Sequence, residues 1–445
     1  MFSRNSIKGM DDVFPSDMRV VNYLTKKLKE ISGLYSYQEY DTPLLEPIEI
    51  YEAKTSSELV NEQSFIVEKK EGEKLILRPE ITPTLARMVA QKEQELKKPI
   101  RWYSIPKCYR YEQPQKGRKR EFLQYNIDIL GEDSLHAELE IFHIVIDILT
   151  SFGATQDQFQ LKFNNRRFID AVSELILEIP EQKYSTVYDV LDKSDKMEDD
   201  EFEKFVRDSF QNEFIIQSIY KLRDADDLEE LLESFSDIPE SFYESQGYKE
   251  LKTLENLIQK SGIEKYCSFS SGIVRGLDYY TGTVFEVFDT GKENIRAIFG
   301  GGRYDDLLSI FSDKELSGIG FGMGVLMLEL FLRTYDLLPE DLEEPDYSDV
   351  IYITTIGEEV APYVFKLAQK IRKQSLSCMV DYRFDNLGNQ LSKANDLGVH
   401  ITLIIGPDEM KENQVTIKNM VSEEQKTIPS EDLFREISNI QEELS

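Results

Sequence analysis

The sequence predicts an α+β protein made of more than one folded part, and three observations support this. Two segments between residues 100 and 130 alternate apolar and polar side chains, which is typical of paired antiparallel strands. Residues 166–265 have helical patterning and many acids. Beyond residue 349, short apolar strands alternate with helical patterns, as they do in an α/β domain.

Length and composition set the broad class. A chain of 445 residues can bury large cores and predicts two or three domains. Hydrophobic residues make up 40% of the chain, which is ordinary for a globular protein in water. No apolar run approaches the roughly 18 residues that a membrane span needs, and the N-terminal MFSRNSIKGMDDVFPSD lacks the apolar core of a signal peptide. We therefore expect a cytoplasmic protein.

Cysteine and histidine are too few and too scattered to predict a disulfide framework or a zinc site. The three cysteines, Cys108, Cys267 and Cys378, are far apart and odd in number, which suits a reducing compartment. His136 and His143 fall two turns apart on a predicted helix, and the third histidine is distant from both. Packing or surface roles are favoured over metal binding for these side chains.

The charge distribution predicts one anion site in an acidic chain. The formal net charge of −31 opposes indiscriminate binding of nucleic acid. Against this background, Lys107–Arg120 (KCYRYEQPQKGRKR) holds six basic residues and one acid. Such a local reversal of sign indicates a place where phosphates or carboxylates bind. A solvated hairpin tip with the same composition is the alternative.

The flanking segments, Ile100–Tyr111 and Glu121–Leu130, predict the two strands of a hairpin. Arg110 and Glu112 share one face of the first strand. The second strand carries a polar face, formed by Gln124, Asn126 and Asp128. Its other face is apolar, formed by Leu123, Tyr125, Ile127 and Ile129. The hairpin is therefore expected to present a polar substrate floor with cations at its tip; a solvent-facing sheet surface would show the same alternation.

The segment Gly272–Asp289 (GIVRGLDYYTGTVFEVFD) places charged and phenolic groups ahead of a predicted strand, Thr283–Phe288. An arginine, an acid and two tyrosines surround Gly276; they are Arg275, Asp278, Tyr279 and Tyr280. Arg275 and Tyr280 have opposite parity, so a regular strand would separate them, and Gly276 is expected to form a bulge that redirects one of them. A surface salt bridge beside two packing tyrosines is the alternative.

Glycine alternates with apolar residues in a third segment. The residues Gly318, Gly320, Gly322 and Gly324 predict a strand with one bare face, followed by an apolar helix over Val325–Leu332. Gly300, Gly301 and Gly302 add a second stretch of this kind. We expect something flat, or another backbone, to approach these faces closely. Neither stretch has the pattern of a phosphate-binding loop, and close helix–sheet packing is the alternative.

The order of five segments resembles that of the class II aminoacyl-tRNA synthetases, and within them the histidyl-tRNA synthetase family. Tyr40–Pro47 (YDTPLLEP) resembles motif 1, and Leu77–Arg87 (LRPEITPTLAR) resembles a substrate-binding segment. Tyr109–Asp128 resembles motif 2 with its PQKGR loop. Val274–Tyr280 (VRGLDYY) and Gly300–Asp305 (GGGRYD) are similar to the two signatures that separate the histidine enzymes from other class II members.

One departure from the family pattern concerns ATP. Motif 3 usually ends with an arginine that stacks on adenine, whereas Met327 stands at that position here. Met327 offers a softer apolar contact; Arg303 and Arg333 are the candidate replacements for the arginine. Motif 2 departs more mildly, because Asp128 is shorter than the glutamate common in bacterial relatives and Gln113 replaces a frequent arginine.

The resemblance implies a domain plan and a set of partners. Residues 1–165 and 266–336 would form the catalytic core, an antiparallel sheet flanked by helices, and 166–265 a helical insertion that clamps the tRNA acceptor arm. Residues 337–349 would be a linker, and 350–445 an α/β anticodon-binding domain. The implied substrates are histidine, ATP and tRNA(His), with Mg²⁺ bridging the pyrophosphate and no membrane partner. Motif 1 likeness implies a homodimer.

The resemblance also implies roles for the residues at the phosphates of ATP. Arg110 would hold the α-phosphate and the histidine carboxylate, and Arg275 would stabilise the α-phosphate from the other side. Glu112 would accept a hydrogen bond from the adenine amino group. Further nucleotide contacts are assigned to Arg118, Arg120, Gly322 and Gly324.

Histidine and tRNA would be bound by a second group of residues. The α-ammonium of histidine would bind to Glu80, Thr82 and Gln124. The imidazole would bind to Asp128 and Tyr280, with Tyr279 beside them. Gln115 and Lys116 would contact the acceptor end of the tRNA, while the resemblance assigns no metal ligands.

Two alternatives keep the fold and change the function. The first is a paralogue without ligase activity that serves as a regulatory subunit of ATP phosphoribosyltransferase in histidine biosynthesis, and Met327 favours it. Arg110, Glu80, Arg275 and the PQKGR loop favour the synthetase, as does the C-terminal domain. The second alternative is an RNA-binding scaffold, in which the phosphate arginines would have no task.

Overall fold

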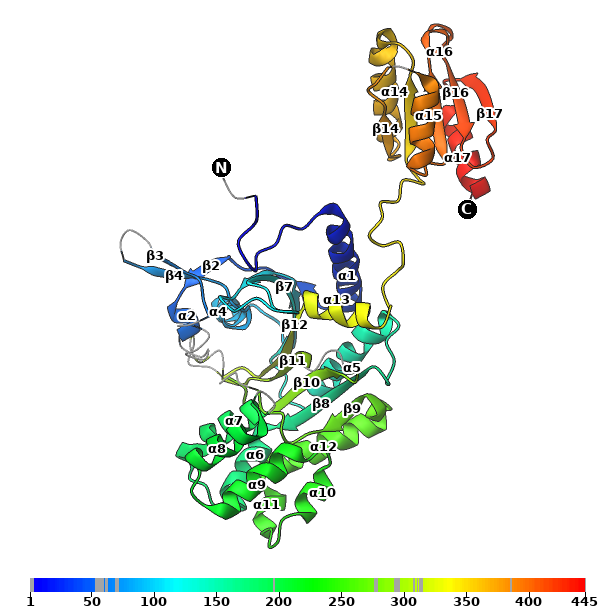
Figure 1. The fold of residues 1–445 in the computed structure, drawn as a ribbon. Coiled ribbons are helices and arrows are strands. Elements are labelled where there is room, and N and C mark those ends of the chain that lie inside the picture. The colour runs from blue at the N-terminus through cyan, green and yellow to red at the C-terminus, as the bar shows by residue number, and fades with distance from the viewer. Residues whose placement is uncertain are drawn as a thin grey trace. The chain divides into compact units, whose positions relative to one another are not determined.

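The computed structural model describes residues 4–52, 60, 63–68, 72–194, 197–275, 279–291, 297–306, 309, 311, 315–384 and 386–444. The chain divides into two compact units, Met1–Leu342 and Glu343–Ser445 (Figure 1). Each unit has its own hydrophobic core. Of the helices in these described ranges, none is long and apolar enough to cross a membrane.

A large sheet forms the centre of the first unit. Within the described residues it has nine strands, in the order β1-β5-β7-β12-β11-β10-β8-β9, and β6 pairs with β7. Neighbours are antiparallel except at the two ends, where β1 pairs with β5 and β8 with β9 in parallel. The strands are β1 (Gln38–Glu39), β5 (Ile100–Ser104), β6 (Lys107–Tyr109), β7 (Glu121–Leu130), β8 (Phe159–Asn165), β9 (Cys267–Phe269), β10 (Thr283–Asp289), β11 (Ala297–Arg303) and β12 (Gly318–Gly324).

One face of this sheet is apolar and is covered by helices α1 (Pro15–Leu34), α5 (His136–Ser151) and α13 (Val325–Thr334). On β7 the alternation predicted from the sequence is confirmed. Tyr125, Ile127 and Ile129 join the hydrophobic core, and the polar residues between them face a pocket on the other side. The strands predicted at 121–130 and 283–288 and the helix at 325–332 are also confirmed.

The strand predicted over Ile100–Tyr111 is wrong as a single element. It is broken between Ser104 and Lys107 into β5 and β6. Pro106 lies at the break, and proline has no N–H to donate to a strand partner. Both pieces still pair with β7, so the hairpin itself is confirmed.

The glycine strands β11 and β12 lie side by side in the sheet, with Gly302 opposite Gly320 and Gly300 opposite Gly322. A Cβ added at Gly301 would lie 2.1 Å from the carbonyl oxygen of Gly320, so the neighbouring backbone occupies that space. The expected close approach is therefore made partly by the chain itself. The bulge expected at Gly276 lies outside the described residues.

A helical region follows β8 and packs into the same core, beyond the β8–β9 edge of the sheet (Figure 1). Asn165, Asn212, Asp227 and Ser245 cap four of its helices with their side chains. The helices are α6 (Arg166–Leu175), α7 (Tyr184–Lys193), α8 (Asp199–Ser209), α9 (Glu213–Asp224), α10 (Leu228–Glu233), α11 (Glu240–Glu244) and α12 (Gln246–Ser261).

A small sheet completes the first unit, and its described strands number three, in the order β2-β4-β3. Its elements are β2 (Leu45–Pro47), β3 (Ile66–Glu68) and β4 (Lys74–Leu77), with α2 (Glu49–Glu52) and α4 (Thr82–Lys92) nearby in the chain. Tyr51 of α2 is fully buried and donates a hydrogen bond to the carbonyl of Glu80 at 3.0 Å. This hydrogen bond fixes the start of α4, where two pocket residues lie.

The second unit is the predicted α/β domain. Its five described strands follow the order β14-β13-β15-β16-β17, with the first three parallel. They are β13 (Ile351–Thr355), β14 (Cys378–Val380), β15 (Ile401–Ile405), β16 (Gln414–Asn419) and β17 (Gln425–Pro429). The helices are α14 (Ala361–Lys373), α15 (Leu387–Asp396), α16 (Pro407–Glu412) and α17 (Leu433–Leu444).

The predicted fold class is thus confirmed: an antiparallel sheet with flanking helices, a helical region and a C-terminal α/β domain. The subdivision of the first unit into 1–165 with 266–336 and an insertion at 166–265 stays a prediction, as do the exact limits of the linker.

Candidate active site

An open pocket lies on the polar face of the large sheet and holds about 990 Å³ of empty space, part of it shared with solvent. This is enough for a nucleotide and an amino acid together. Residues far apart in the sequence meet here. The described residues that line it are Glu80, Thr82, Arg110, Glu112, Gly117, Arg118, Lys119, Phe122, Gln124, Asn126, Asp128, Arg275, Tyr279, Tyr280, Gly300, Tyr304, Gly320, Phe321, Gly322, Gly324, Leu326 and Met327.

Most of the site residues predicted from the sequence lie in this lining. Three do not: Gln115, Lys116 and Arg120. Gln115 pairs with Arg118 in the tight turn of the motif 2 loop. The guanidinium of Arg120 lies 4.1 Å from the ring centroid of Tyr111, and its Nε donates to the carbonyl of Glu112. Arg120 therefore supports the loop in this structure and does not face the pocket.

Arg110 follows directly after β6 and reaches the pocket between two segments. Its Nε donates to the carbonyl of Pro79 at 3.0 Å, and its guanidinium lies 5.4 Å from the ring centroid of Phe122. Nη1 is 4.0 Å from Oε1 of Glu112. The hydrogen bond to the backbone orients the guanidinium plane and leaves further N–H groups for an anion.

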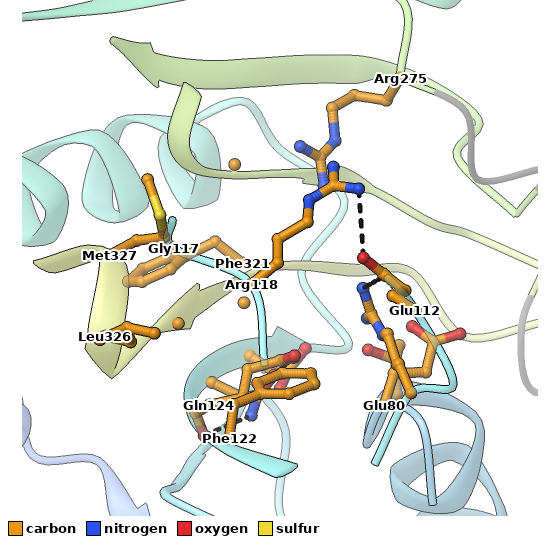
Figure 2. A pocket seen from close by; sticks show the side chains of 18 of the residues that line it. Glu80, Glu112, Gly117, Arg118, Phe122, Gln124, Arg275, Phe321, Leu326 and Met327 are labelled. Carbon is orange, nitrogen blue, oxygen red and sulfur yellow. Dashed lines mark hydrogen bonds and ion pairs between the residues drawn. The ribbon is translucent and has the colours of Figure 1, made fainter. Parts of the chain in front are cut away.

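Glu112 is already paired on its other oxygen. Nη1 of Arg118 donates to Oε2 of Glu112 at 3.1 Å, and Figure 2 shows the Arg118 side chain extended toward it. Half of the Arg118 side chain is exposed, so water weakens this ion pair. A ligand with its own hydrogen-bond donor can therefore compete for Glu112, which releases Arg118 to an anion.

Arg275 enters the pocket from the segment between β9 and β10 and has a left-handed backbone, with φ of 59°. Its Nη1 donates to Oε1 of Glu286 at 2.6 Å, and its buried Nε has no hydrogen-bond partner among the described residues. Burial lowers the pKa of Arg275, but the neighbouring Tyr280 and Glu286 outweigh it and the net pKa is raised. The guanidinium is therefore a permanent cation at the pocket wall.

The glycines of β11 and β12 make room for these side chains. A Cβ at Gly300 would lie 2.6 Å from Nη1 of Arg275. At Gly322 it would lie 2.6 Å from Nε2 of Gln124. The space beside these glycines is thus occupied by the guanidinium of Arg275 and the amide of Gln124, in addition to neighbouring backbone.

Asp128 lies at the floor of the pocket, 3% exposed. Its Oδ1 accepts a hydrogen bond from the hydroxyl of Tyr304, and Oδ2 is buried with no partner among the described residues. Burial raises the pKa of Asp128 to about 7, although the hydrogen bond from Tyr304 opposes the rise. A buried acceptor without a partner is costly, so this atom marks a place for a ligand N–H.

Two tyrosines and a glutamate form the wall next to Asp128. The hydroxyl of Tyr279 donates to Oε2 of Glu80 at 3.1 Å, and Glu80 is 3% exposed. The rings of Tyr279 and Tyr280 lie 4.9 Å apart. Burial, and then the charge of Glu80, raise the pKa of Tyr279 well above its ordinary value. Both phenols therefore stay neutral donors, and Glu80 provides a carboxylate for an ammonium group.

The other end of the pocket is apolar, with Phe122, Phe321, Leu326 and Met327 in its lining. Met327 lies against the motif 2 loop, next to Gly117 in Figure 2. A Cβ at Gly117 would lie 2.3 Å from the sulfur of Met327, and φ of Gly117 is +79°. The positive φ favours glycine there, whereas the flexible Met327 side chain could move away from an added Cβ.

The two arginines considered as replacements at the Met327 position both have other partners in this structure. Arg303 is 3% exposed and its guanidinium binds Glu138 through Nε and Nη2, each at 2.5 Å. Arg333, in the last turn of α13, pairs with Glu329 at 2.9 Å. Neither lines the described pocket.

Sequence reasoning did not assign three side-chain contacts at the pocket. Tyr304 orients Asp128, Glu286 pairs with Arg275, and Asn126 accepts a hydrogen bond from Nε2 of Gln124 at 2.7 Å. A signal was present for two of them. Glu286 is a lone charge within an apolar strand, and Asn126 shares the polar face of β7. Tyr304 stands in the GGGRYD segment that resembles a family signature, but nothing local indicated its hydrogen bond to Asp128, because that partner is 176 residues away.

The described residues contain no group of three or more His, Cys, Asp or Glu side chains that could hold a metal ion. The carboxylates of Glu112 and Glu286 are each paired with an arginine. The described lining therefore presents no cluster of metal ligands, and a magnesium ion would enter as the companion of a nucleotide's phosphates.

Comparisons with known proteins match nearly the whole chain. A model of the histidyl-tRNA synthetase family matches residues 9–328, and an anticodon-binding domain model matches 350–440. A histidine–tRNA ligase of Leptospira biflexa is 38% identical over 98% of this chain and 97% of its own length. One from Haloarcula marismortui is 32% identical over 96% of this chain and 95% of its own length.

Solved structures share the fold. The histidyl-tRNA synthetase of Nostoc matches 99% of this chain and 100% of its own chain with a TM-score of 0.74 at 23% identity. A Bacillus halodurans protein, titled an ATP phosphoribosyltransferase regulatory subunit/histidyl-tRNA synthetase, matches 91% of this chain and 98% of its own with a TM-score of 0.69 at 20% identity. At these identities the likeness concerns the fold alone. The family model and the two ligases at 38% and 32% identity show that the chain belongs to the histidyl-tRNA synthetase family of class II aminoacyl-tRNA synthetases.

Proposed function

We propose that this chain activates histidine with ATP and transfers it to tRNA(His). The observation that carries the proposal is the convergence, in one pocket, of two arginines, a carboxylate wall and an unpaired buried acceptor: Arg110, Arg275, Glu80 and Asp128. Phosphoryl chemistry needs the cations, and recognition of an amino acid with an imidazole needs the acids.

The first step joins two anions. The carboxylate oxygen of histidine attacks the α-phosphorus of ATP, the bond to the bridging oxygen of the β-phosphate breaks, and pyrophosphate leaves. Arg110 holds the α-phosphate and the carboxylate, and Arg275 stabilises the α-phosphate from the other wall as charge develops. Neutralisation and in-line positioning supply most of the rate enhancement in such reactions.

At the polar end, Glu80 and Thr82 bind the α-ammonium together with Gln124. Asp128 accepts from one imidazole N–H through Oδ2, and Tyr280 binds the other nitrogen. An amino acid without these nitrogens would leave the buried Asp128 unpaired, which is the basis of selection for histidine.

At the apolar end, Phe122 and Met327 flank the base of ATP, and the bare backbone of Gly322 and Gly324 lies along its ribose. Glu112 accepts from the adenine amino group and releases Arg118 to the β- and γ-phosphates. Magnesium accompanies these phosphates, and no step is assigned to a protein-bound metal.

In the second step, a terminal ribose hydroxyl of tRNA attacks the carbonyl carbon of the adenylate, the bond to the AMP phosphate oxygen breaks, and AMP leaves with the hydroxyl proton on its phosphate. Gln115 and Lys116, outside the pocket on the motif 2 loop, contact the acceptor end. The helical region 166–265 clamps the acceptor arm, and the second unit binds the anticodon. Arg120 keeps its predicted nucleotide role only if its contact with Tyr111 opens.

We further infer a homodimer built on the segment that resembles motif 1, where Leu44 and Leu45 are exposed. We also infer a cytoplasmic location, which suits the three free cysteines, Cys108, Cys267 and Cys378.

Histidine-dependent exchange of pyrophosphate into ATP tests the proposal on the purified chain. Exchange with histidine, and not with other amino acids, is expected. The regulatory-subunit alternative is supported by one feature, Met327 in place of the arginine expected at the end of motif 3. Folded protein that binds histidine and shows no exchange would favour that alternative and contradict ligase activity.

A further inference from the structure

Arg166 connects the helical region to the loop that carries Arg275. It is the first residue of α6, directly after β8, and is 6% exposed. Each of its guanidinium nitrogens donates to a backbone carbonyl. Nε donates to Val274 at 3.1 Å, Nη1 to Tyr280 at 3.0 Å and Nη2 to Arg275 at 2.6 Å. One side chain thus holds the backbone at two of the three described residues of this segment that line the pocket, Arg275 and Tyr280.

The backbone that carries these carbonyls has an unfavourable conformation. Arg275 has φ of 59°, a value that residues with a Cβ rarely adopt. Such a residue persists only where the surrounding structure fixes it. The carbonyls before and after its Cα both accept from the Arg166 guanidinium, so Arg166 stabilises the conformation that points the Arg275 side chain into the pocket.

Arginine is the side chain that this position requires. Its planar fork presents several N–H donors in fixed directions, whereas a lysine ammonium is a single flexible point. The ring of Tyr188, from α7, lies 4.7 Å from the guanidinium and covers it. Arg166 is not among the described residues that line the pocket, so any effect it has on the reaction passes through the loop.

We propose that Arg166 is a positioning residue for adenylate formation: by fixing the backbone at Arg275 and Tyr280 it sets the approach of the Arg275 guanidinium to the α-phosphate. The proposal rests on the function proposed above. It also gives the first helix of the helical region a part in the chemistry of the pocket.

The test is Arg166→Lys, measured by histidine-dependent exchange. We expect kcat to fall about 10- to 100-fold, because a misplacement of about 1 Å at a reacting centre costs on the order of 10²-fold. KM for ATP should change less than about threefold, because the weakened interaction, between Arg275 and the α-phosphate, develops in the transition state. Arg101→Lys is the matched control. Arg101, on β5, also donates through two nitrogens, at 2.8 and 2.9 Å, to the carboxylate of Glu140. Replacement of Arg101 should leave kcat near the wild-type value.

A double-mutant cycle separates positioning from a general loss of stability. In an Arg275→Lys background, which keeps a cation, Arg166→Lys should cost less than about threefold in kcat, because the guanidinium that it positions is already absent. Full additivity, or unchanged exchange in the single variant, would overturn the proposal. If Arg166→Lys does not fold, Arg166→Gln takes its place in the cycle. If neither variant folds, Arg166 has a structural role only and the proposal is overturned. Wild-type protein without exchange would instead contradict the function itself.

Discussion

At the scale of single residues, Asp128 carries the most chemical information. Its burial, its one hydrogen bond from Tyr304 and its unpaired Oδ2 define an acceptor of fixed direction. The sequence predicted that Asp128 lies on the polar face of β7, because side chains alternate between the two faces of a strand and this alternation can be read locally. It could not predict the orientation by Tyr304, because that hydrogen bond depends on the packing of β12 between them.

A pH profile tests Asp128. Its pKa in the folded protein is raised from 3.8 to about 7, so kcat/KM for histidine should rise with pH through about 7 as the carboxylate ionises to accept the imidazole N–H. Asp128→Asn should remove this limb and lower kcat/KM at pH 8 about 10- to 100-fold, the worth of a charged hydrogen bond. The imidazole of the substrate also titrates in this pH range, and the profile of Asp128→Asn measures that contribution separately. An identical pH limb in Asp128→Asn would contradict the assignment.

The same shift affects stability with a defined sign. Because the folded-state pKa lies above the unfolded value, the native state binds the extra proton, and ionised Asp128 destabilises the fold. The free energy of unfolding should therefore lose a component as pH rises from about 4 to about 7. Urea unfolding of wild type and Asp128→Asn across this range measures it, and the variant should lack the component.

Met327 is the departure from the family pattern that concerns ATP. Met327→Ala should raise KM for ATP about 2- to 10-fold, since thioether–aromatic contacts contribute ~0.3–1.5 kcal/mol. KM for histidine should stay unchanged, because the two ends of the pocket are separate. Met327→Leu is the control, retaining apolar volume. If KM for histidine changes and KM for ATP does not, the adenine base does not bind next to Met327.

At the scale of elements, regular strands were predictable and interrupted ones were not. β7 and β12 follow from alternation alone, because a sheet with one buried face imposes a period of two on the sequence. The break had a local signal in Pro106 that the strand pattern outweighed, whereas the left-handed Arg275 is held by contacts from Arg166, far away in the sequence. The bare faces of β11 and β12 were predicted, but their main occupants are side chains of the protein itself.

Gly320 on β12 shows what a bare face contributes. A Cβ there would lie 2.3 Å from the carbonyl oxygen of Ile127 and 2.4 Å from Oδ1 of Asp128, both too close. Gly320→Ala should therefore destabilise the protein by about 1–3 kcal/mol, the usual cost of overpacking, and raise KM for histidine. Gly33→Ala is the control. Nothing lies within 4 Å of its added Cβ on α1, so it should stabilise by about 0.5–1 kcal/mol. Equal thermal shifts in both variants would refute this interpretation of the strand.

At the scale of the whole molecule, the net charge of −31 repels tRNA, so binding must rely on local reversals of sign. One is the motif 2 loop. Another lies on the second unit, where Ala361–Val380 contains four basic residues and no acid. Two exposed aromatic side chains accompany it: Phe365 on α14 and Tyr382 after β14, 42% and 70% exposed, with ring centroids 6.3 Å apart and planes 14° from parallel. Rings of this kind are platforms on which unpaired bases stack.

The second unit should therefore bind tRNA through this aromatic pair. Tyr382→Ala is expected to raise KM for tRNA about 5- to 150-fold, because stacking of one base contributes about 1–3 kcal/mol. Histidine-dependent pyrophosphate exchange, which needs only the pocket of the first unit, should stay at the wild-type rate. Val421→Ala removes an exposed apolar side chain from the same unit and serves as the control, with no change expected in either assay. Tyr382→Phe should bind tRNA as wild type does, since the ring face is kept. Weaker binding in Tyr382→Phe equal to that in Tyr382→Ala would mean that the hydroxyl, and not stacking, makes the contact.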